Sequence, residues 1–71
     1  MTDDDLHKAR DVSLMLADQM DKLAEMHDRL GQSDDAALLR VVADSNRKVA
    51  ERYRVQIEQR AWMATKARIA Q

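Results

Sequence analysis

Residues 6–30 follow alternating spacings of three and four, the period of a helix that buries one stripe of its surface. The members of this stripe are Leu6, Ala9, Ser13, Leu16, Met20, Leu23, His27 and Leu30. Thr2 and Asp5 stand at the spacing of a capping box, which satisfies free backbone N–H groups at a helix start. We therefore expect a helix over residues 3–30.

A second stripe with the same spacing begins at Leu39 and continues towards the C-terminus. It comprises Leu39, Val42, Asn46, Val49, Tyr53, Gln56, Arg60, Met63, Ala67 and Ala70. If the first stripe continued past residue 30, it would bury Asp34, Asp44 and Lys48, so one unbroken helix is disfavoured. We therefore expect a turn over residues 31–33 and a second helix over residues 34–70.

The turn contains the only glycine of a chain that has no proline. Gly31 can adopt the left-handed conformation that ends a helix, because it has no Cβ atom. Ser33 can cap the next helix, and Asp34 and Asp35 suit the positive end of its dipole. The sequence thus predicts an all-α fold in a single domain, 1–71, formed by a two-helix antiparallel hairpin.

Two helices leave each stripe half covered, and a chain of 71 residues buries only a small core. We therefore expect a homodimer, in which two hairpins form a four-helix bundle with packing similar to that of a coiled coil. The expected hairpin or dimer core is Leu16, Met20, Leu23, Leu39, Val42, Asn46, Val49 and Tyr53. The orientation of the two copies is left open.

Charge is unevenly distributed in a chain whose net charge is only −1. Acidic residues dominate the first predicted helix and basic residues the second, so the two halves complement each other. Arginines at seven-residue spacing could form a ridge for RNA or DNA phosphates, namely Arg40, Arg47 and Arg54, with Arg68 in the same phase. Acids four residues after the first three would offset their charge, and the near-neutral total argues against general nucleic-acid affinity.

The two predicted helices are unequal, about 42 Å and about 55 Å long at 1.5 Å per residue. Residues from about 60 onward should therefore project past the start of the first helix. This segment contains the only tryptophan, Trp62, which with Val55, Met63 and Ile69 could anchor another protein. The alternative is that the second copy of a dimer covers Trp62, because apolar stripes at helical spacing usually belong to a core.

Candidate chemistry is sparse. The chain has no cysteine, and His7 and His27 lie too far apart on one helix to share a metal ion. We find no catalytic or cofactor motif, no signal peptide and no apolar run of membrane-spanning length, which together favour the cytoplasm. The sequence predicts a non-enzymatic interaction module, such as an adaptor, an assembly chaperone or an inhibitor of a partner protein. A nucleic-acid-binding regulator is the alternative.

Overall fold

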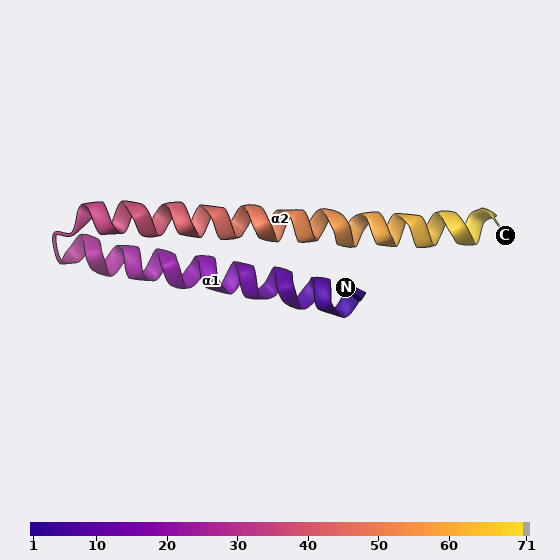
Figure 1. Ribbon diagram of the computed structural model, residues 1–71, viewed down its shortest axis with the longest axis horizontal. Helices are drawn as coiled ribbons and strands as arrows, with labels where there is room; N and C mark the ends of the chain where they lie inside the picture. Colours follow the sequence, from indigo (N-terminus) through magenta and orange to yellow (C-terminus); the bar gives the residue numbers. More distant parts are fainter. Residues whose placement is uncertain (71) are drawn as a thin grey trace.

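The computed structural model describes residues 1–70, which form two helices connected by a short turn (Figure 1). Helix α1 comprises Asp3–Arg29 and helix α2 comprises Ser33–Ala70, and the two run antiparallel along each other. The molecule is elongated, with extents of 62 × 15 × 14 Å. The predicted all-α hairpin is confirmed, although α1 ends and α2 begins one residue earlier than expected.

The N-terminus of α1 is closed by the predicted capping box. The Asp5 backbone N–H donates to Thr2 Oγ1 at 3.2 Å, and the Thr2 backbone N–H donates to Asp5 Oδ2 at 3.1 Å. The hydrogen bonds from Thr2 favour the ionised carboxylate, so they lower the pKa of Asp5 below its ordinary value. Local sequence therefore fixes where α1 begins.

The C-terminus of α1 ends in a Schellman motif centred on Gly31. Its φ angle is 74°, in the left-handed region that favours glycine. The N–H of Gln32 donates to the carbonyl of His27 at 2.8 Å, and the N–H of Gly31 donates to that of Asp28 at 3.1 Å. His27 Nδ1 also donates to Gln32 Oε1, so a polar side-chain pair links the two ends of the motif.

Helix α2 begins at Ser33 itself, which corrects the expectation that Ser33 would be the cap. The N–H of Ala36 donates to the carbonyl of Gln32 at 3.1 Å, so Gln32 occupies the cap position. Asp34 and Asp35 lie in the first turn, where their charge is favourable to the helix dipole.

Small residues form most of the contact between the two helices. The buried side chains are Leu6, Ser13, Ala17 and Ala24 on α1, and Ala36, Ala43 and Ala50 on α2. Within each helix most of them recur at intervals of seven, so they lie on one face. Because alanine allows helix axes to approach closely, larger apolar side chains are displaced to the edges of this contact.

The eight residues expected in the core lie at those edges. Leu16, Leu23 and Val42 are 37%, 40% and 41% exposed. The other five, Met20, Leu39, Asn46, Val49 and Tyr53, are half-buried. The hairpin contact thus uses the face next to the predicted one, and burial of the predicted residues by a second copy stays a prediction.

Helix α2 extends past the N-terminus of α1, as the unequal helix lengths predict (Figure 1). Arg60 forms an ion pair with Asp3 at 3.1 Å, at the level where α1 begins. All of residues 61–70 are exposed. We refer to residues 61–70 as the overhang.

Candidate protein-binding surfaces

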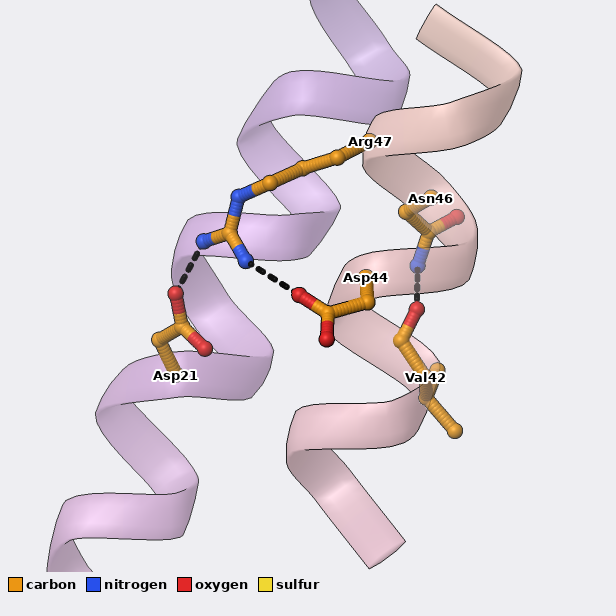
Figure 2. Close-up of polar contacts among 5 residues, drawn as sticks. All are labelled: Asp21, Val42, Asp44, Asn46 and Arg47. Atoms are coloured by element: carbon orange, nitrogen blue, oxygen red, sulfur yellow. Dashed lines mark hydrogen bonds and ion pairs between the residues drawn. The ribbon is translucent and has the colours of Figure 1, made fainter.

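One flank of the hairpin is formed by ion pairs, and we call it the charged flank. Arg40 pairs with Asp28, and Arg47 pairs with Asp21, so two bridges connect α2 to α1. Figure 2 shows Arg47 extending across to Asp21, while Asp44 on its own helix accepts a second bond at 3.3 Å. The expected attraction between an acidic and a basic helix is therefore present as specific contacts.

These contacts occupy the arginines that could have formed a phosphate-binding ridge. Arg54 pairs with Glu51 and Glu58, so each of the three ridge arginines on this flank has a carboxylate partner. The hydrogen bonds to Asp21 and to Glu51 raise the pKa values of Arg47 and Arg54 above the ordinary arginine value. The fourth predicted residue, Arg68, lies apart in the overhang. Paired charges produce a weaker external field than unpaired charges of one sign.

A shallow open cavity of about 140 Å³ lies on the charged flank. It is lined by Arg10, Leu14, Arg47, Ala50, Glu51 and Arg54. Arg10 is itself paired with Asp11 at 3.1 Å, so each arginine around the cavity already has a carboxylate partner. An anionic ligand would therefore meet arginines whose positive charge is already partly neutralised.

The opposite flank is apolar, and helix geometry determines its position. Each residue advances about 100° around a helix, so Leu16 lies about 100° to one side of the buried Ala17, whereas Asp21 lies about 40° to the other. On α2, Val42 and Arg47 have the same relation to Ala43. Because Arg47 meets Asp21, the charged sides of the two helices coincide, and hence the apolar sides coincide as well.

This apolar flank comprises Val12, Leu16 and Leu23 on α1, and Val42 and Val49 on α2. Met26 and Leu38, each two residues after a buried alanine, lie about 160° from the contact and extend the flank towards the outer surface. All of them are exposed except Val49, which is half-buried. Leu38 was not part of the predicted stripe, but its spacing of four from Val42 is a signal that could have identified it. A contiguous apolar surface on one side of a small protein is typical of an interface.

The four candidate partner-binding residues do not all lie on one face. Val55, Trp62 and Ile69 are spaced by seven and form one column along α2, which we call the Trp62 column. Trp62 follows the half-buried Ile57 by five residues, which places it about 140° from the side that faces α1. Met63 lies about 100° away from this column, although it is also exposed.

Other kinds of site find no support in the part of the chain that the structure describes. Within residues 1–70, no group of three histidine, cysteine or acidic side chains is placed to hold a metal ion. Neither helix, over its described length, has an apolar segment long enough to cross a membrane. Comparison with protein-family models, curated proteins and solved structures finds no match to this chain.

Proposed function

We propose that this chain is a non-enzymatic protein–protein interaction module that works as a homodimer. Two hairpins pack through their apolar flanks and form a four-helix bundle, which then acts on a partner protein as an adaptor, an assembly chaperone or an inhibitor. The observation that carries the proposal is the division of the hairpin into two flanks, one closed by ion pairs and one apolar and open.

A second copy is the occupant that this surface fits best. The intrachain contact buries mainly alanines, and alanine contributes little hydrophobic stabilisation because its side chain is small. Leu16, Leu23 and Val42 each retain about 40% of their exposure, so covering each one further is worth about 1 kcal/mol. In a two-fold symmetric dimer every such contact occurs twice, once for each copy. The free energy gained by covering these side chains is therefore doubled, which favours self-association over binding of an unrelated protein that covers only one copy.

The charged flank is consistent with the same arrangement. Its ion pairs are solvent-exposed, and charges of this kind are favoured on the outside of a bundle. With the apolar flank inside and the charged flank outside, each hairpin has the polarity that a four-helix bundle requires.

Sedimentation equilibrium at micromolar concentrations tests the proposal directly. We expect a species of twice the chain mass, and circular dichroism that weakens on dilution together with the loss of that species. A monomer that keeps its full helical signal at these concentrations would refute the dimer.

A further inference from the structure

Beyond the Asp3–Arg60 ion pair, α2 continues without α1 beside it, and large apolar side chains lie on this segment. Trp62 is 64% exposed and Ile69 is 78% exposed, and Val55 one interval earlier is 38% exposed. An exposed tryptophan in line with two aliphatic side chains has the composition of a binding hot spot.

The charge of the same segment has one sign. After Glu58 the sequence contains no acidic residue, and the overhang contains Lys66 and Arg68, both of which are exposed. Lys66 lies four residues after Trp62 and three before Ile69, so its amino group borders the apolar column between them. This arrangement is complementary to an apolar surface edged by carboxylates.

The proposed dimer would not cover this column. Around the axis of α2, Trp62 lies about 140° to one side of the direction that faces α1, and the apolar flank lies about 100° to the other side. The remaining angle between the Trp62 column and the apolar flank is therefore about 120°. A second copy packed on the apolar flank therefore leaves the Trp62 column accessible on the outside.

We propose that the Trp62 column binds an acidic amphipathic helix of another protein. The apolar face of that helix packs on Val55, Trp62 and Ile69, and its carboxylates lie beside Lys66, while Arg68, about 100° around α2 from Ile69, adds positive charge to the segment. A straight column with a seven-residue interval suits a helix laid along it, because a partner helix repeats its own apolar positions at the same interval. An anionic membrane is the weaker match, since polybasic recognition of lipid uses clusters of four to eight bases.

This inference deepens the proposed function by naming the chemistry of the partner, and it rests on that function only in treating the chain as an interaction module. It does not need the dimer. The two proposals can therefore fail separately.

Trp62 is the only tryptophan of the chain, so tryptophan fluorescence reports directly on binding at the Trp62 column. The full chain is titrated with a synthetic helical peptide that has leucine on one face and glutamate on the other, and Trp62 emission is recorded. Matched titrations use the same peptide with lysine in place of glutamate, and vesicles of phosphatidylcholine with phosphatidylserine. We expect a saturable blue shift with the glutamate peptide and none with the lysine peptide or the vesicles.

Two double variants examine the charge. Lys66→Glu with Arg68→Glu should weaken binding of the glutamate peptide about tenfold, because the charge contact at Lys66 becomes repulsive and the positive charge of Arg68 on the same segment is reversed. Lys8→Glu with Lys22→Glu makes the same change in net charge on exposed positions of α1 and should leave the affinity unchanged.

The inference is overturned by the absence of a shift, by an equal response to the lysine peptide, by a response to vesicles in place of the peptide, or by equal weakening in the two variants. Sedimentation of the same samples reports the dimer independently. Monomeric protein that still binds the glutamate peptide would refute the dimer alone, and a dimer without binding would refute this inference alone.

Discussion

Leucines on opposite flanks of α1 provide a matched pair of substitutions. Leu23 lies on the apolar flank and is 40% exposed, and Leu14 lies beside the arginines of the charged flank and is 44% exposed. Both are in the interior of the same helix, so Leu→Asp has about the same helix-propensity cost, less than 1 kcal/mol, at either position. A difference between the two variants therefore reports on what covers each flank.

The expected magnitude for Leu23→Asp follows from the dimer. Losing the apolar contact costs about 1 kcal/mol per copy, and placing a carboxylate in a desolvated interface costs several kcal/mol more per ion. Symmetry doubles both costs. Even a total of about 4 kcal/mol would raise the dissociation constant about a thousandfold. Leu14→Asp introduces a carboxylate near Arg10, Arg47 and Arg54, where it stays solvated, so we expect the dimer to persist.

Sedimentation equilibrium and size-exclusion chromatography at a fixed micromolar concentration measure the outcome, with circular dichroism recording helix content. We expect Leu23→Asp to be monomeric and Leu14→Asp to be dimeric. If both variants stay dimeric, the apolar flank is not the dimer contact. If only Leu14→Asp dissociates, the copies associate through the charged flank and the reasoning above is wrong.

Three further substitutions test the hairpin itself. Ala43→Leu should lower the free energy of unfolding by about 1–3 kcal/mol through overpacking, whereas Ala37→Leu on the exposed side should change it by less than about 0.5 kcal/mol; equal urea midpoints would contradict the alanine contact. Gly31→Ala should cost about 1–2 kcal/mol in urea unfolding, entirely from the backbone, because no atom lies within 4 Å of the added Cβ; an unchanged midpoint would argue against the left-handed turn. Thr2→Ala should raise the pKa of Asp5 slightly in an NMR titration, because the Thr2 side chain is lost while the larger contribution, from the Thr2 backbone N–H, remains; an unchanged pKa would show that the Thr2 side chain does not stabilise the carboxylate. Since the folded pKa of Asp5 is depressed, its stabilisation is present above the unfolded value of 3.8 and is lost as pH falls through the folded value, and Thr2→Ala should reduce this acid-dependent loss.

Features determined by neighbouring residues were predictable from the sequence. The capping box requires only Thr2 and Asp5 at the right spacing, and the turn requires only a glycine that can adopt a positive φ. The overhang then follows from where the turn divides the chain. None of these depends on knowing which face of a helix meets its neighbour.

The identity of the contact face was harder to predict, because two adjacent stripes compete for it. Leu16 and Ala17 are neighbours in sequence, and the larger side chain was expected to lie inside. In a pair of helices without further layers, close approach of the backbones decides the contact, so Ala17 and Ala43 are buried while Leu16 and Val42 lie beside them. The signal for the hairpin contact was present as alanines at seven-residue spacing, next to the stripe of larger side chains whose burial by a second copy stays a prediction.

To predict the binding residues, one needs the direction in which each side chain projects around the axis of α2 as well as the amino-acid composition of the segment. Val55, Trp62 and Ile69 share one phase, and that much is visible in the sequence. Their direction relative to α1 became defined only when the buried face was known, and this direction separates them from Met63 and from the apolar flank.

The three bridges between the helices also predict an order of assembly. Asp28 and Arg40 are 12 residues apart in the chain, Asp21 and Arg47 are 26 apart, and Asp3 and Arg60 are 57 apart. Because the entropy lost in closing a loop grows with its length, the bridge nearest the turn forms most easily, and the hairpin should close like a zipper from Gly31 outward. In the folded protein, the contacts that close the longest loops should open most easily. Amide hydrogen exchange should therefore become faster along the hairpin from the turn towards Asp3. Local opening is therefore concentrated at the end of the hairpin from which Trp62 projects.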